Sequence, residues 1–140
     1  MATAFALDHI VLVVTDVERS LTWYMKHAGL ASVNVDEWRA GQAFFPSLRV
    51  SEATIIDYVP GDSASARGHL DHVCFVVSAT DLESIGNDTD LTIVDQGLRS
   101  GAKGVGTSIY VRDPDDLLVE FRSYPTDAAS THVVASSGSD

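Results

Sequence analysis

Two stretches of alternating and β-branched apolar residues set the plan of the chain. Leu7-Asp8-His9-Ile10-Val11-Leu12-Val13-Val14 returns 63 positions later as Leu70-Asp71-His72-Val73-Cys74-Phe75-Val76-Val77. Runs of this kind are typical of strands. Each is followed by a segment with a helix-capping residue and an apolar stripe, and then by three further strand-like stretches. The pattern therefore predicts an α+β fold in which a unit of one strand, one helix and three further strands occurs twice.

The first repeat is predicted to extend over about residues 6–59. Its helix is expected to begin at the Thr15-Asp16 cap, to continue through Lys26 and to end before Gly29, which suits a left-handed residue. Three strands are expected at 31–38, 42–50 and 53–59. The small, polar stretch 60–68 is expected to be a linker.

The second repeat is predicted to extend over about residues 69–124. A helix is expected at 80–86, and strands at 91–96, 107–112 and 117–123. The glycine-rich stretch 97–106 is expected to form a mobile loop, and the Asp113-Pro114-Asp115-Asp116 segment a turn. Residues 1–124 are thus predicted to form one domain, and the Ser-, Ala- and Thr-rich residues 125–140 a disordered tail.

Charge and composition exclude several classes of function. The formal net charge of −11 argues against nucleic-acid binding, although it would suit a cationic ligand. The single cysteine, Cys74, excludes an intrachain disulfide and favours a reducing, cytoplasmic location. The N-terminus does not have the pattern of a signal peptide, and the apolar runs are too short to span a membrane. We therefore expect a cytoplasmic protein that binds neither nucleic acid nor membranes.

The repeat also duplicates side chains that could bind a metal. His9 and His72 occupy the same place in their repeats, and each repeat ends with a strand that carries an acid, Asp57 in the first and Glu120 in the second. A charged group inside an apolar strand is costly unless it is paired or bound to a metal. If the two repeats pack about a pseudo-twofold axis, these side chains would converge. Two imidazoles and a carboxylate suit a divalent transition metal.

Over about residues 6–124 the sequence resembles the vicinal oxygen chelate superfamily. The resemblance is carried by the repeated plan, by the two Leu-Asp-His stretches and by the segment Tyr110-Val111-Arg112-Asp113-Pro114-Asp115-Asp116-Leu117-Leu118-Val119-Glu120-Phe121. This superfamily holds glyoxalases, bleomycin-resistance proteins and extradiol dioxygenases. The resemblance implies paired βαβββ modules that form a cupped, barrel-like mixed sheet around a metal. It places metal ligands at His9, His72 and Glu120. Many relatives have glycine where Asp116 stands.

The resemblance leaves the role of Asp57 open. Relatives with a fourth ligand carry a longer side chain on this strand, so Asp57 is a fourth ligand, a general base or a strand-edge carboxylate. A one-residue slip in the alignment would place Ile56 there instead.

Further candidates surround this constellation. Tyr110 is a candidate hydrogen-bond donor to a substrate oxygen, with simple packing as the alternative. Trp38, Phe44, Phe45 and Tyr58 are candidate walls of an apolar substrate pocket, or else core residues. Cys74 shares the face of His72, so it lies near the metal or, as we expect, is a buried, inert thiol. His69 would replace His72 as a ligand in another register. An anionic substrate would meet one of three arginines: Arg39, Arg49 or Arg67.

Three functions follow from the resemblance. The first is an Fe(II)-dependent, extradiol-type dioxygenase, ranked first because three ligand positions match. The second is a glyoxalase-, epimerase- or lyase-type enzyme without redox chemistry, in which Ni²⁺, Zn²⁺, Mn²⁺ or Co²⁺ replaces iron; Asp57 as a ligand or base would favour it. The third is a non-catalytic antibiotic-binding resistance protein, which the negative charge would suit. In each case we expect a small-molecule ligand and a homodimer.

Overall fold

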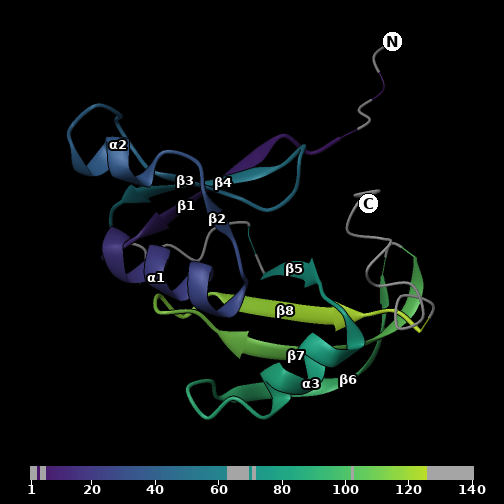
Figure 1. The fold of residues 1–140 in the computed structure, drawn as a ribbon. Coiled ribbons are helices and arrows are strands. Elements are labelled where there is room, and N and C mark those ends of the chain that lie inside the picture. The colour runs from purple at the N-terminus through teal and green to yellow at the C-terminus, as the bar shows by residue number, and fades with distance from the viewer. Residues whose placement is uncertain (1–2, 4–5, 63–69, 71, 102, 126–140) are drawn as a thin grey trace. The chain divides into compact units, whose positions relative to one another are not determined.

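The chain folds into two compact units, Met1–Ala66 and Arg67–Asp140, which are described separately (Figure 1). The computed structural model describes residues 3, 6–62, 70, 72–101 and 103–125. Each unit is a βαβββ module with its own mixed four-stranded sheet, so the predicted α+β class and the duplicated plan are confirmed. Residues 63–68 of the predicted linker and 126–140 of the predicted tail lie outside the described residues, and Pro60 belongs to the last strand of the first module.

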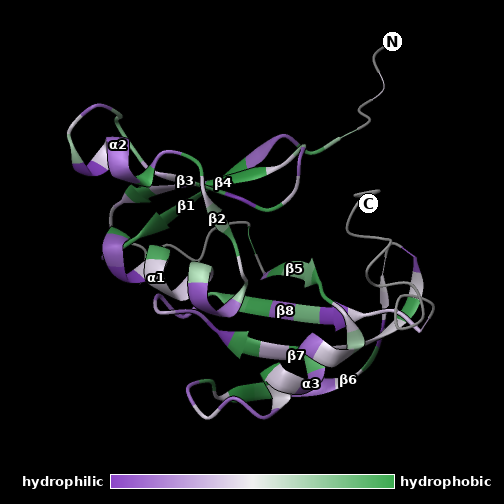
Figure 2. Ribbon diagram, in the orientation of Figure 1, coloured by the Kyte–Doolittle hydropathy of each residue, from purple (hydrophilic) through white to green (hydrophobic). Residues whose placement is uncertain are grey.

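The first module holds a four-stranded sheet in the order β1-β4-β3-β2, in which β1 and β4 are parallel and the other pairs antiparallel. Helix α1 packs against β4, and in Figure 2 hydrophobic residues follow β1 and β4. The elements in chain order are β1 (His9–Val14), α1 (Val17–His27), β2 (Ala31–Ser32), α2 (Val35–Arg39), β3 (Ser47–Arg49) and β4 (Ile55–Pro60).

Helix α1 forms where the capping and stripe patterns predicted it. The Asp16 side chain accepts a hydrogen bond from the Arg19 backbone N–H at 3.0 Å and so satisfies one free donor of the first turn. Gly29 follows the helix with φ +67°, the left-handed conformation that glycine adopts without strain. Leu21 and Tyr24 are fully buried, and the Tyr24 ring meets that of Tyr58 on β4. This contact forms the centre of the first core.

The second module repeats the sheet, in the order β5-β8-β7-β6, with β5 and β8 parallel. Helix α3 packs against β7 and β8. Phe121 of β8 is fully buried and stacks on Phe75 of β5. The elements are β5 (His72–Val76), α3 (Ala79–Gly86), β6 (Ile93–Gly101), β7 (Gly104–Arg112) and β8 (Leu118–Ser123).

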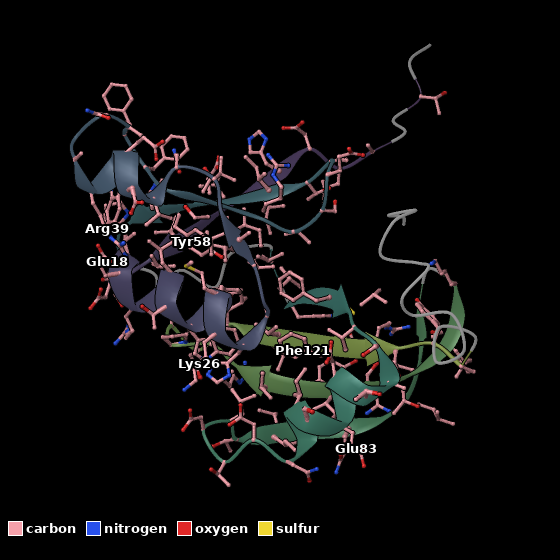
Figure 3. All side chains as sticks on the ribbon, viewed as in Figure 1. Glu18, Lys26, Arg39, Tyr58, Glu83 and Phe121 are labelled. Carbon is pink, nitrogen blue, oxygen red and sulfur yellow. The ribbon has the colours of Figure 1, made fainter. Side chains whose placement is uncertain are left out.

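The strand predicted at 31–38 is wrong beyond its first residues. Only Ala31–Ser32 pair as a strand, and the chain then turns into the short helix α2. The Ser32 hydroxyl accepts the Val35 N–H at 3.1 Å and starts the helix. Arg39 at its end binds Glu18 of α1 through two hydrogen bonds of 2.9 and 2.7 Å, so α2 is anchored by a tertiary contact (Figure 3).

The loop predicted at 97–106 is wrong as well. β6 continues to Gly101 and β7 begins at Gly104, and the two strands pair antiparallel to their ends. Gly97 and Gly104 take positive φ values of +150° and +103°, which let the backbone bend while the ladder is kept. These glycines therefore shape a hairpin.

No helix in the described ranges is long and apolar enough to cross a membrane.

Candidate metal centre

The same strand register occurs in both modules. His9 on β1 lies opposite Ile55 and Val11 lies opposite Asp57; in the second module His72 lies opposite Leu118 and Cys74 opposite Glu120. Because alternate residues share a face of a sheet, each histidine faces the same side as the acid of its own module. Asp57 is thus the structural counterpart of Glu120.

In this register Ile56, the residue that a slipped alignment would put in place of Asp57, faces away from His9. Ile56 is 2% exposed and points to the opposite side, where α1 covers the sheet. The residue that shares the face of His9 is Asp57.

In the second module His72 and Glu120 meet directly. His72 Nε2 lies 3.2 Å from Glu120 Oε1. The Glu120 side chain is 3% exposed, whereas that of His72 is 36% exposed. A buried carboxylate therefore presents one oxygen beside an imidazole that solvent and small molecules reach.

The second oxygen of Glu120 is held by its neighbours. Oε2 accepts hydrogen bonds from Ser108 Oγ at 2.6 Å and from Arg122 Nη2 and Nε at 2.8 and 3.2 Å. Burial by itself would raise the pKa of Glu120, but these hydrogen bonds, with the charge of Arg122, lower it below its ordinary value. Glu120 is accordingly ionised, the form in which a carboxylate ligates a metal.

The spacing of this pair fits a metal ion. Nitrogen and oxygen ligands at about 2.0–2.2 Å from a cation, on adjacent coordination positions, lie about 3.0–3.4 Å from each other. The 3.2 Å between His72 Nε2 and Glu120 Oε1 falls in that interval. Imidazole with carboxylate is also a donor set that divalent transition metals accept.

In the first module, His9 is oriented by Asp8. Its Nδ1 lies 2.8 Å from Asp8 Oδ2, so this hydrogen bond uses Nδ1 and not Nε2, the nitrogen that could ligate a metal. The pKa of His9 is raised, chiefly by this hydrogen bond and also by the charge of Asp57. Asp57 itself is 7% exposed and accepts a hydrogen bond from Ser47 Oγ at 2.6 Å. A histidine and a carboxylate thus share one sheet face in this module too.

Tyr110 lies beside the His72–Glu120 pair. It is opposite Glu120 on β7, and its ring centroid is 6.0 Å from that of His72. Burial and the charge of Glu120 raise the pKa of Tyr110, so the hydroxyl keeps its proton. The hydroxyl is a hydrogen-bond donor on the same face as the pair.

The four aromatic residues expected to line a pocket have different environments. Tyr58 is fully buried against Tyr24, on the face opposite to Asp57, and is a core residue. Trp38 is half-buried on α2, and Phe44 and Phe45 lie in the segment between α2 and β3, the first fully exposed and the second 38% exposed.

The remaining candidate residues are less suited to a catalytic or binding role. Cys74 is exposed, so the expected burial is wrong, but desolvation and the charge of Glu120 raise the pKa of its thiol to about 11, which makes the thiol unreactive. Arg39 is bound to Glu18, and Arg49 donates to the backbone carbonyls of Ser51 and Glu52. His69 and Arg67 lie outside the described residues.

The supporting residues Asp8, Ser47, Ser108 and Arg122 were not identified from the sequence. For Arg122 the sequence does contain a signal, because strand alternation places it on the same face as Glu120. Within the ranges that the structure describes, no three His, Cys, Asp or Glu side chains gather into a complete cation site. Each module taken by itself supplies a pair.

Comparison with known proteins agrees with this architecture. Residues 6–121 match the family model described as the Glyoxalase/Bleomycin resistance protein/Dioxygenase superfamily. The chain belongs to this superfamily. Members of the superfamily often bind divalent metals.

Two known proteins are similar to this chain in sequence. Virulence protein STM3117 of Salmonella typhimurium is 30% identical over 121 residues, which cover 84% of this chain and 83% of that protein. The glyoxalase domain-containing protein RDO1 of Mycosarcoma maydis is 29% identical over 122 residues, covering 85% of this chain and 68% of that protein.

Solved structures agree in fold. The crystal structure of STM3117 superposes with a TM-score of 0.70 at 26% identity and covers 88% of this chain and 99% of that one. The fosfomycin resistance protein FosX of Mesorhizobium loti gives a TM-score of 0.64 at 17% identity, covering 91% and 99%, which is a likeness of fold alone.

Proposed function

We propose that this superfamily member is a divalent-metal-dependent enzyme acting on a small molecule with two neighbouring oxygens, with His72 and Glu120 of the second module as metal ligands; His9 stays a ligand predicted from the sequence. The observation that carries the proposal is the 3.2 Å approach of His72 Nε2 to the ionised, buried Glu120. A metal held there acts as a Lewis acid that polarises the substrate oxygens.

The surrounding residues prepare these ligands. Ser108 and Arg122 keep Glu120 ionised and fixed, and Asp8 sets the tautomer of His9. We assign to the Tyr110 hydroxyl, which keeps its proton, a hydrogen bond to a substrate oxygen. In this scheme these residues hold the ligands in place and orient the substrate.

We further propose that the reaction is a proton transfer of the glyoxalase, epimerase or lyase kind, with Asp57 as the carboxylate that moves the proton. Asp57 is buried, is held by Ser47 and shares the face of His9, as expected for a base beside a ligand. The sequence alone ranked a dioxygenase first. We rank it second because Asp57 is buried on the face of His9, which supports a role in proton transfer.

An Fe(II)-dependent dioxygenase is the second candidate. It is favoured by the ligand set itself, since two histidines and one carboxylate with open positions is the arrangement of many non-haem iron oxygenases. In that case Asp57 would contribute little to the rate.

Metal content and two variants test these assignments. Wild-type protein reconstituted with Co²⁺ and dialysed should retain one ion per chain, and His72→Ala and Glu120→Gln should each lose it. Glu18→Gln, which alters a carboxylate bound to Arg39, is the matched control and should retain the ion. Wild-type protein that retains no ion would contradict the proposed metal site. If such protein binds cationic antibiotics, the third function, a non-catalytic resistance protein, would replace the metalloenzyme.

Asp57→Asn separates the two reactions. In a screen of thiohemiacetals, 2-substituted acyl thioesters and catechols, proton-transfer activity should fall at least about 100-fold in this variant. Oxygen uptake with catechols that survives Asp57→Asn would favour the dioxygenase. The predicted homodimer is checked by light scattering of the same preparations.

A further inference from the structure

The second module's candidate ligand is paired with a buried cation. Arg122 is 4% exposed and binds Glu120 through two of its nitrogens, at 2.8 and 3.2 Å. It also donates hydrogen bonds to the Ser100 carbonyl at 2.9 Å, the Tyr124 hydroxyl at 3.3 Å and the Arg99 carbonyl at 3.4 Å. The guanidinium is thus fixed, and it stands on the same strand face as Glu120.

Space for this guanidinium is provided by Gly101. A Cβ at position 101 would overlap Arg122 Nη1, and it would come within 2.7 Å of the Tyr124 hydroxyl. The end of the β6–β7 hairpin is therefore shaped around the cation. A buried ion pair is not in itself a strong source of stability, so its presence next to a ligand calls for another role.

Charge balance on this face suggests that role. The formal net charge of the whole chain is −11. In the second module, however, each of the three arginines for which the structure shows an ion pair is matched by one acidic residue. These pairs are Arg122–Glu120, Arg99–Asp95 and Arg112–Asp116. Because Arg122 offsets the charge of Glu120 and a ligating histidine is neutral, a divalent cation held here would keep most of its double charge.

We infer that Arg122 is a specificity-determining residue that reserves the metal site for negatively charged chelating ligands. The inference rests on the proposed metal site and adds the charge class of the substrate. An uncompensated double charge attracts a dianionic oxygen chelator, and removing the arginine charge weakens that attraction. A neutral chelator has no net charge and responds little.

Oxalate and glycolamide are the probes, one a dianion and the other neutral, both offering two neighbouring oxygens. Protein saturated with Co²⁺ is titrated with each, and the visible Co²⁺ absorption reports binding. Wild-type protein should bind oxalate more tightly than glycolamide. Arg122→Met should weaken oxalate binding about 10-fold or more and change glycolamide binding less than about twofold.

Three further variants separate charge from structure. Arg122→Lys restores the charge and should recover most of the oxalate affinity. Arg122→Gln keeps a hydrogen-bonding side chain without charge; it should behave like Arg122→Met and serves if that variant does not fold. Arg39→Met removes the other arginine that binds a glutamate through two nitrogens and should leave both affinities unchanged.

Two results would overturn the inference. One is oxalate affinity that stays at the wild-type value in the uncharged variants, and the other is equal loss of oxalate and glycolamide binding. Wild-type protein that does not take up Co²⁺ would instead overturn the metal site, so the two failures are distinguishable.

Discussion

The Glu120–Arg122 pair offers a sharp test of how this face is held together without metal. Glu120→Gln keeps the shape of the side chain and an acceptor oxygen for Ser108, but it leaves the Arg122 guanidinium buried without a counter-charge. Both side chains are 5% exposed or less, so solvent cannot replace the lost partner.

The magnitude follows from that burial. Breaking a buried ion pair by removing one partner costs about 3–5 kcal/mol, and Gln retains some hydrogen bonding, so we expect the free energy of unfolding to fall by about 3 kcal/mol. Folding should survive, since domains of this size are stable by roughly 5–15 kcal/mol. The double variant Glu120→Gln/Arg122→Met removes both charges and should be more stable than the sum of the single effects predicts, by about 2 kcal/mol.

Urea unfolding of the four proteins in the presence of a chelator measures this coupling. The comparison pair is Glu18 with Arg39, in which two guanidinium nitrogens bind the two carboxylate oxygens rather than a single one, and in which both side chains are about half exposed. Its coupling should be clearly smaller, because water screens it. A coupling for Glu120–Arg122 no larger than that of the exposed pair would refute the reasoning.

Three other predictions concern single groups. Hydrogen bonds from Arg39 lower the pKa of Glu18, so the stability this pair contributes is present above the unfolded-state pKa and is lost as the pH falls through the folded one. The difference in unfolding free energy between wild type and Arg39→Met should therefore disappear between about pH 5 and about pH 2; a constant difference would contradict this. Asp116 has φ +71°, so Asp116→Gly should raise the free energy of unfolding by up to about 1 kcal/mol in urea titrations, and Asp116→Val should lower it. Because the pKa of Cys74 is raised to about 11 from 9.0, its thiolate fraction at mildly alkaline pH falls about 100-fold, and iodoacetamide should alkylate it about that much more slowly in native than in urea-unfolded protein.

The elements with strong local signals were predictable from the sequence. β1, β5 and α1 are specified by apolar runs, by the Asp16 cap and by Gly29. Helix α2 was not predictable, because five residues do not form a helix by propensity and this one depends on the contact of Arg39 with Glu18. The β6–β7 hairpin was also missed, since its glycines read as a loop until the pairing partner is known.

The candidate site divides in the same way. Repetition in the sequence pointed to His9, His72, Asp57 and Glu120, and the strand register places each acid on the face of its histidine. The hydrogen bonds that fix the acids come from residues distant in sequence, Ser47 to Asp57 and Ser108 to Glu120. Such partners follow from cross-strand pairing, which a single sequence does not reveal.

The constant offset of 63 between the modules also has a practical use. The segments 31–50 and 94–113 occupy equal lengths between matching strands, yet one contains α2 and the other most of a long hairpin. Exchanging or randomising one of these cassettes would therefore leave the numbering of both His–acid strand pairs intact. A directed-evolution library confined to these segments, with Ser47, Ser108 and Tyr110 kept because they support or join the candidate site, would diversify the rest of both segments and leave the four His–acid strands unaltered.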